Sequence, residues 1–327
     1  MVSRPVMGIV VPCYNEEEVL PAAREALLGQ LDALISREAV SEGSFVLFVD
    51  DGSQDGTWRL IVEYAAADKR VKGLKLAGNA GHQNALFSGL MQARTISDCT
   101  VSIDADLQDD VAAIGYFLEK YAEGNHIVYG IRKERGTDTS FKRNSAQTFY
   151  KLMRIFGVKL RYNHADYRLL SRQALDALEL YREGHLFLRG IVPLLGFRSA
   201  EVYYNRLERA AGVTKYPLRK MLSFAFDGIT SFSNIPIRLI TYAGIMTLAA
   251  SVAAVAYVIA SIAAGSVVPG WTSIMISVWV LGGLQLVGIG VVGEYIGKIF
   301  MEVKRRPRYV VEAFTDDKTN DENGREF

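Results

Sequence analysis

The longest uncharged stretch of the chain constrains its fold more than any other feature. Residues 239–293 contain no Asp, Glu, Lys or Arg. Residues 239–264 would form a helix of about 39 Å, against about 30 Å of hydrocarbon in a bilayer. Glycine and proline interrupt the stretch at residues 265–271, and residues 272–293 are again long enough to span. The pattern predicts a two-helix transmembrane hairpin over residues 235–300; the alternative is a buried helix pair in a soluble protein.

The charges that flank this stretch predict its orientation. Arg238 precedes the first helix, the connecting segment is uncharged, and five basic residues follow the second helix: Lys298, Lys304, Arg305, Arg306 and Arg308. By the positive-inside rule, both ends of the hairpin lie in the cytoplasm. The apolar stretch near the N-terminus is too short for a secretory signal. We therefore expect an integral protein of the cytoplasmic (inner) membrane, with both termini and the remaining domain in the cytoplasm.

The first part of the chain alternates between strand and helix patterns. Strands are predicted at residues 6–11, 45–49, 71–76, 100–103 and 127–129, and helices at residues 17–35, 57–67, 83–94 and 111–121. Such alternation is typical of an α/β domain whose mainly parallel sheet carries helices on both faces.

The remaining boundaries follow from composition. We assign residues 1–216 to the α/β domain and residues 217–234 to an amphipathic helix in the membrane interface, with a plain core helix as the alternative. The hairpin occupies residues 235–300, and residues 301–327 form a basic and then polar tail.

With 37 basic and 36 acidic residues, the chain lacks the basic excess typical of nucleic-acid binding. Its two cysteines, Cys13 and Cys99, are predicted to be buried free thiols.

Two carboxylates, Asp104 and Asp106, directly follow the apolar strand predicted at residues 100–103. Active sites of α/β proteins gather at the carboxyl ends of strands. Carboxylates this close repel each other unless a cation or a donor lies between them, and oxygen ligands suit a hard divalent ion. The pair indicates an Mg²⁺ or Mn²⁺ site; the alternative is a solvated loop.

Two further loops carry polar residues at strand ends. Asp50 and Asp51 can accept hydrogen bonds from a base N–H or from ribose hydroxyls, whereas Asp55 is placed to cap the following helix. His82 lies in a loop before the next helix, whose N-terminus can face an anion. A structural role for this histidine is as well supported as a ligand role.

Several motifs together resemble the signature of family 2 inverting glycosyltransferases with the GT-A fold. They are Pro12-x-Tyr14-Asn15-Glu16, then Asp50-Asp51-Gly52-Ser53-x-Asp55, then Asp104-Ala105-Asp106-Leu107-Gln108. Residues 166–172 and 206–216 are similar to the polyprenyl-phosphate glycosyltransferase branch, which includes dolichyl-phosphate mannose synthase and bactoprenol glucosyltransferase. The resemblance covers roughly residues 6–308. The sequence differs from the usual family pattern at Asp109-Asp110, because family members usually have a proline soon after the residue that corresponds to Gln108. No Arg-Trp pair occurs, which argues against a processive polysaccharide synthase.

The resemblance implies a Rossmann-like GT-A catalytic domain that uses a nucleotide sugar donor and a lipid acceptor. It implies that the nucleoside is held by Pro12, Tyr14, Glu16, Asp50 and Asp51. Asp104 would lie near the ribose and the metal, and Asp106 and Gln108 would coordinate Mg²⁺ or Mn²⁺. The ion would stabilise charge on the leaving nucleoside diphosphate.

A phosphate acceptor needs cations beside the anionic donor. The candidates are Arg132, Arg135, Arg143 and Lys215, and a solvated surface position is the alternative for each. A phosphate monoester has a second pKa of about 6 and needs little deprotonation before it attacks. Asp166 matches the family's base position, but orienting the acceptor or pairing with Arg168 is equally plausible.

We therefore expect transfer of a sugar, with UDP-glucose as the favoured donor, to undecaprenyl or dolichyl phosphate for cell-envelope glycosylation. Alternatives are a diacylglycerol acceptor, a GDP-mannose-dependent polyprenyl-phosphate mannose synthase, and a non-catalytic membrane protein with an inherited transferase domain. The glycine-rich hairpin predicts a homo-oligomer. No nucleic-acid partner is expected.

Overall fold

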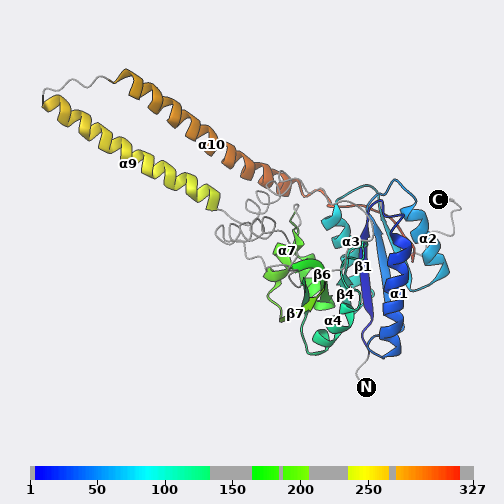
Figure 1. Ribbon diagram of the computed structural model, residues 1–327. Helices are drawn as coiled ribbons and strands as arrows, with labels where there is room; N and C mark the ends of the chain where they lie inside the picture. The colour runs from blue at the N-terminus through cyan, green and yellow to red at the C-terminus, as the bar shows by residue number, and fades with distance from the viewer. Residues whose placement is uncertain (1–3, 133–163, 184–186, 206–234, 265–269, 317–327) are drawn as a thin grey trace. The chain divides into compact units, whose positions relative to one another are not determined.

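The computed structural model describes residues 4–132, 164–183, 187–205, 235–264 and 270–316. These residues divide into two compact units. The sheet unit contains residues 4–132, 164–183, 187–205 and 307–316, and the helical unit contains residues 235–264 and 270–306. Figure 1 shows both, with the helical unit formed by two long helices.

The sheet unit is built on an eight-stranded sheet in the order β7-β5-β6-β4-β1-β2-β3-β8. The strands are β1 Met7–Cys13, β2 Phe45–Asp50, β3 Val71–Leu76, β4 Cys99–Ser102, β5 Ile127–Arg132, β6 His164–Ser171, β7 Ser199–Tyr204 and β8 Val311–Phe314. β1 pairs in parallel with β2 and β4, β2 with β3, and β5 with β7. β6 lies antiparallel between β4 and β5, and β8 lies antiparallel to β3. The sheet is therefore mixed, and it contains all five predicted strands.

Helices cover both faces of this sheet. They are α1 Leu20–Ser36, α2 Thr57–Ala67, α3 His82–Arg94, α4 Ala113–Ala122, α6 Arg172–Glu179, α7 Leu188–Ile191 and the 3₁₀ helix η1 Val192–Leu195. Ile9 and Val11 of β1 join a buried cluster with Leu27 of α1. Val10 points to the opposite face, because side chains alternate along a strand, and there it meets Gly89 of α3. Because helices cover both of its faces, every side chain of β1 is buried, which explains why this inner strand lacks charged residues.

The edge strand β8 was not predicted, since its residues fall in the segment assigned to the tail. After α10 (Trp271–Lys304) the chain returns to the sheet unit, and β8 pairs with β3. Thr315 N donates to Gly73 O at 3.0 Å, and Lys75 Nζ lies 2.8 Å from Glu312 Oε1. The residues that follow the last long helix therefore complete one edge of the sheet.

The helical unit consists of α9 Ile235–Ala263 and α10 Trp271–Lys304. Its large apolar side chains are exposed, for example Met246, Leu286 and Val303, so these helices are not the core of a soluble unit. Among the described residues, one stretch, Val280–Lys304, is long and apolar enough to cross a membrane, while Ile235–Thr247 is apolar but shorter. The predicted hairpin of two spanning helices is therefore not confirmed. The predicted amphipathic helix at 217–234 lies outside the described residues.

The contact between α3 and the sheet predicts an unequal response of two helical glycines. A Cβ added at Gly89 would lie 2.5 Å from Val10 Cγ1 and 2.5 Å from Val49 Cγ2, whereas one added at Gly29 of α1 meets nothing within 4 Å. Gly89→Ala should destabilise the fold by about 1–3 kcal/mol through overpacking. Gly29→Ala should be neutral or stabilise by up to about 1 kcal/mol. Thermal unfolding of the purified variants checks this, and equal Tm values would contradict it.

Candidate functional site

The loops after β1 and β2 are joined by hydrogen bonds at the carboxyl ends of these strands. Asn15 adopts a left-handed conformation (φ 53°) and accepts from Gln54 N at 2.8 Å through Oδ1. Glu16 N donates to Thr57 Oγ1 at 2.9 Å. Asp55 was predicted to cap α2, but the N-cap residue is Gly56; Asp55 precedes it and accepts from Thr57 N at 3.0 Å. The motif residues of both loops thus form one connected rim.

Asp50 and Asp51 are both buried but have different partners. Both oxygens of Asp51 accept from backbone amides before α3, from Ala80 N at 2.7 Å and from Gly81 N at 3.0 Å. Asp51 therefore ties this loop in place. Oδ1 of Asp50 accepts from Ser53 N, whereas its buried Oδ2 has no hydrogen-bond partner among the described residues. Burial raises the pKa of Asp50, so a ligand N–H at Oδ2 would relieve an unsatisfied acceptor.

The loop after β4 carries the predicted metal residues. Gln108 is buried, Asp104 and Asp106 are partly exposed, and Gln108 N donates to Asp106 Oδ1 at 3.2 Å. Burial raises the pKa of Asp104, and the neighbouring carboxylates raise it further. No group of three His, Cys, Asp or Glu side chains suited to a metal occurs in the described part of the chain. Two carboxylates and an amide nonetheless match what Mg²⁺ or Mn²⁺ takes when substrate phosphate supplies other ligands.

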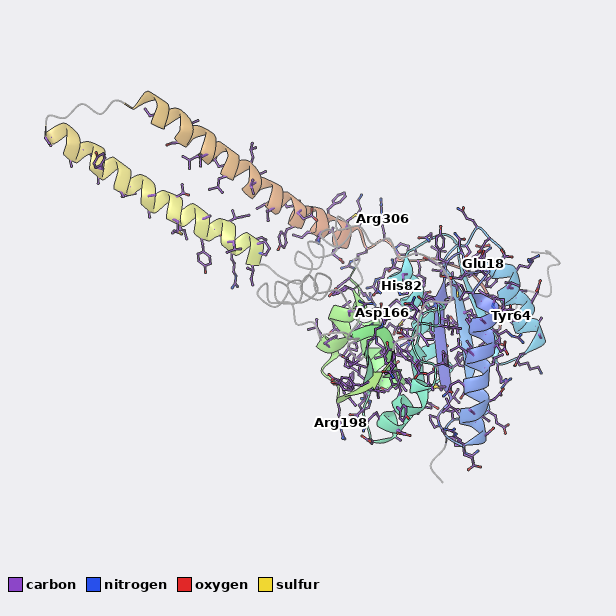
Figure 2. All side chains as sticks on the ribbon, viewed as in Figure 1. Glu18, Tyr64, His82, Asp166, Arg198 and Arg306 are labelled. Carbon is purple, nitrogen blue, oxygen red and sulfur yellow. The ribbon has the colours of Figure 1, made fainter. Side chains whose placement is uncertain are left out.

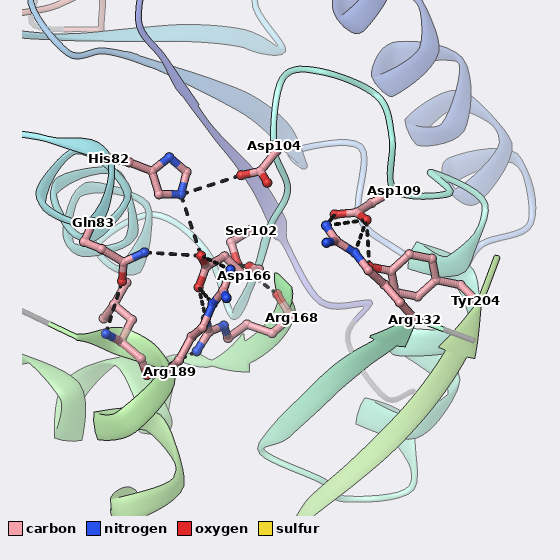
Figure 3. A network of polar contacts seen from close by, with 11 residues as sticks. His82, Gln83, Ser102, Asp104, Asp109, Arg132, Asp166, Arg168, Arg189 and Tyr204 are labelled. Carbon is pink, nitrogen blue, oxygen red and sulfur yellow. Dashed lines mark hydrogen bonds and ion pairs between the residues drawn. The ribbon is translucent and has the colours of Figure 1, made fainter. Parts of the chain in front are cut away.

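Asp166 on β6 is the centre of a polar network (Figure 3). Arg168 Nη2 donates to its Oδ1, and Arg189 Nη2 of α7 donates to its Oδ2 at 3.0 Å. Gln83 Nε2 of α3 donates to Oδ2 at 3.2 Å. His82 Nε2 lies 3.8 Å from Asp166 Oδ2 and 3.6 Å from Asp104 Oδ1. His82 therefore links the network to the predicted metal loop, and Figure 2 shows where His82 and Asp166 lie in the sheet unit.

The partners of Asp166 make it a poor proton acceptor. Burial alone would raise the pKa of this carboxyl, but the nearby imidazole of His82 and the charges and hydrogen bonds of Arg189 and Arg168 hold it well below its usual range. Among the roles left open by the sequence, the geometry supports pairing with Arg168 over general-base catalysis.

A second network lies at the end of β5 (Figure 3). Arg132 donates through Nε and Nη2 to Asp109, at 3.0 and 3.2 Å. Tyr204 of β7 donates to the same Asp109 Oδ1 at 2.8 Å, and Arg132 Nε also lies 3.3 Å from Tyr204 Oη. Asp109 is buried, so it holds both the metal loop and the guanidinium in place.

The structure brings together some predicted residues and adds others. Arg135, Arg143 and Lys215 lie outside the described residues. Pro12 is buried at the end of β1, and Tyr14 is exposed beyond it. Sequence reasoning missed Gln83, Arg189 and Tyr204, because no spacing marks them and only the fold brings them to the site.

The pairing of Asp166 yields a prediction that separates its two possible roles. Asp166→Asn leaves the fully buried Arg168 without its carboxylate, and breaking a buried ion pair costs about 3–5 kcal/mol. We expect a large fall in Tm as well as in activity. Asp104→Asn, which removes a more exposed carboxylate, serves as the matched control and should leave Tm nearly unchanged. A D166N variant that unfolds like wild type but lacks activity would instead favour a pure base.

Solved structures of low identity resemble parts of the chain. Glucosyl-3-phosphoglycerate synthase from Mycobacterium tuberculosis, in complex with Mn²⁺, UDP and phosphoglyceric acid, is 17% identical with a TM-score of 0.43 over 69% of this chain and 76% of that chain. Mannosyltransferase PcManGT from Pyrobaculum calidifontis, in complex with GDP-Man and Mn²⁺, is 15% identical with a TM-score of 0.43 over 93% and 87%.

Sequence comparison gives closer matches. Residues 8–179 match the family model described as Glycosyl transferase family 2. The uncharacterized glycosyltransferase YkoT of Bacillus subtilis (strain 168) is 56% identical over 95% of this chain and 92% of its own length. The bactoprenol glucosyl transferase of Shigella phage SfII is 38% identical over 93% and 97%. The family match spans Asp50 at the end of β2, the loop that carries Asp104 and the strand that carries Asp166.

Proposed function

Because the chain belongs to glycosyl transferase family 2, we propose that it transfers a hexose from a nucleoside-diphosphate sugar to a membrane polyprenyl phosphate. The chain is a glycosyltransferase with a GT-A-like mixed α/β sheet. The proposed product is a polyprenyl-phosphate sugar for cell-envelope glycosylation. Undecaprenyl phosphate is the acceptor and UDP-glucose the donor that we favour, since a relative of nearly equal length is named a bactoprenol glucosyl transferase.

The observation that carries the donor side is the unsatisfied, buried Oδ2 of Asp50. It supports a role for this carboxylate in accepting a base N–H, with Pro12, Tyr14 and Glu16 on the same rim. Asp51 contributes by holding the loop before α3. A divalent ion held by Asp104, Asp106 and Gln108 would stabilise charge on the leaving diphosphate.

The proposal of a lipid phosphate acceptor is supported by cationic side chains near the metal loop and by the apolar helices. Arg132 is fixed by Asp109 and Tyr204 yet 28% exposed, which supports it as a contact for the acceptor phosphate. Arg135, Arg143 and Lys215 are proposed as its companions. Since the acceptor is a phosphate dianion, its oxygen can attack the anomeric carbon directly, with inversion and without a strong base.

The helical unit supports a membrane location. The apolar stretch Val280–Lys304 is proposed as one spanning helix, and the exposed apolar surface of α9 supports it as the second. In this proposal both termini and the transferase domain lie in the cytoplasm, residues 217–234 lie in the interface, and copies associate through the helices. A lipid acceptor would then be anchored in the same membrane as the enzyme.

A transfer assay tests the proposal. Purified protein is incubated with Mg²⁺ or Mn²⁺, labelled UDP- and GDP-sugars, and either undecaprenyl phosphate or diacylglycerol. We expect label in the undecaprenyl phosphate lipid, with the highest rate from UDP-glucose. Asp106→Asn should lower kcat by at least about 100-fold through loss of metal-dependent charge stabilisation. Asp176→Asn, an exposed change on α6, should not lower it. Label that enters only diacylglycerol rejects the proposal.

The network around Arg132 predicts a selective effect of one hydroxyl group. Tyr204→Phe removes one hydrogen bond to Arg132 and one to Asp109, each worth about 1 kcal/mol, or several-fold in affinity. We expect the KM for polyprenyl phosphate to rise about 3- to 10-fold with an unchanged KM for the donor. The adjacent Tyr203 binds Glu201 on the surface, so Tyr203→Phe is the matched control. Equal kinetics of the two variants would exclude this role of Tyr204.

A further inference from the structure

Arg189, which no sequence motif marks, binds Asp166 next to the metal loop. We propose that Arg189 contacts a phosphate oxygen of a substrate and that Asp166 and Gln83 are positioning residues that aim its guanidinium. The inference rests on the proposed function, because it assumes that the site holds phosphate groups of a donor and an acceptor.

The balance of charge around Asp166 requires only one cation. Arg168 is 1% exposed and donates to Asp166 Oδ1, so the buried carboxylate is already neutralised within the sheet. Arg189 adds a second positive charge to the same carboxylate through Nη2 at 3.0 Å and Nε at 3.3 Å. Two arginines thus bind one buried carboxylate, so Asp166 fixes the direction of the Arg189 guanidinium although Arg168 alone already neutralises the carboxylate.

Arg189 is more exposed than Arg168, as contact with a substrate phosphate requires. Arg168 is enclosed, whereas 37% of the Arg189 side chain remains exposed although its guanidinium binds Asp166. A planar guanidinium with several N–H donors is well suited to phosphate oxygens. Arg189 therefore combines a fixed direction with access from solvent.

The backbone that carries Arg189 is fixed from two sides. Leu188, the preceding residue, donates its N–H to Gln83 Oε1 at 3.2 Å, and its carbonyl accepts from Arg168 Nη1 at 3.3 Å. Gln83 also donates to Asp166, so one amide side chain links α3, β6 and α7. Such fixation lowers the cost of ordering the cation when a ligand binds.

The surroundings of Arg189 point to the phosphate part of a substrate. His82 lies between Asp166 and Asp104, within 3.8 Å of both carboxylates (Figure 3). Asp104 belongs to the proposed metal loop, where the diphosphate of the donor and the phosphate of the acceptor must approach each other. Either phosphate has the chemistry that Arg189 would recognise.

The experiment compares Arg189→Gln and Arg189→Lys with wild type in the full-length protein. We expect R189Q to lower kcat/KM at least about 50-fold and R189K to restore part of it, because lysine keeps the charge but not the planar donor set. Arg94→Gln is the matched control, since Arg94 also binds two carboxylates, Asp176 and Glu179, on the surface of the sheet unit. It should behave like wild type. Gln83→Leu should give a smaller loss in the same direction as R189Q.

Binding measurements with UDP in the presence of Mg²⁺ and with farnesyl phosphate identify the source of the phosphate. A 10-fold or larger loss of UDP affinity in R189Q assigns Arg189 to the donor, and a similar loss for farnesyl phosphate assigns it to the acceptor. Unchanged affinity for both, with kcat/KM within twofold of wild type, overturns the inference. An R189Q loss of activity that R189K does not relieve, with a fall in Tm and both affinities unchanged, also overturns it. Failure of wild type to glycosylate polyprenyl phosphate would reject the proposed function alone, because the UDP measurement still tests Arg189.

Discussion

The site depends on one buried ion pair, that of Asp166 with Arg168 on strand β6. Taking a carboxylate and a guanidinium out of water is costly unless further hydrogen bonds compensate them. Here Gln83 and Arg189 supply those bonds to the carboxylate, and the carbonyl of Leu188 accepts one from Arg168. Satisfying this pair therefore draws α3 and α7 toward the same strand, and the site is assembled as a consequence.

The position of β6 between β4 and β5 makes this arrangement possible. Ser102, the last residue of β4, donates to the backbone carbonyl of Asp166, so the antiparallel strand brings Asp166 close to the end of β4, where the metal loop starts. On the far side of that loop, Asp109 holds Arg132. The loop is thus flanked by two carboxylate–arginine networks. In the proposed reaction this places positive charge on both sides of the point where two anionic substrates meet.

Elements with a continuous or periodic apolar pattern were predictable, and those that depend on distant contacts were not. The strands at 6–11 and 45–49 were predicted because they are almost wholly apolar. β6 contains a buried Asp and a buried Arg within its strand, and β8 is a strand of only four residues in the segment assigned to the tail, so neither was predicted. The carboxylates at strand ends were recognised, but the use of Asp51 to tie a loop and the pairing of Arg189 depend on the tertiary fold.

The central claim is that a sugar is moved, in one displacement, from a nucleoside diphosphate to a lipid phosphate. Mass spectrometry of the lipid product, combined with NMR of its anomeric proton and phosphorus, tests this most directly. The account predicts one hexose on a single phosphate, with the anomeric configuration opposite to that of the donor. A product with a diphosphate linkage, or with the configuration of the donor retained, would contradict it.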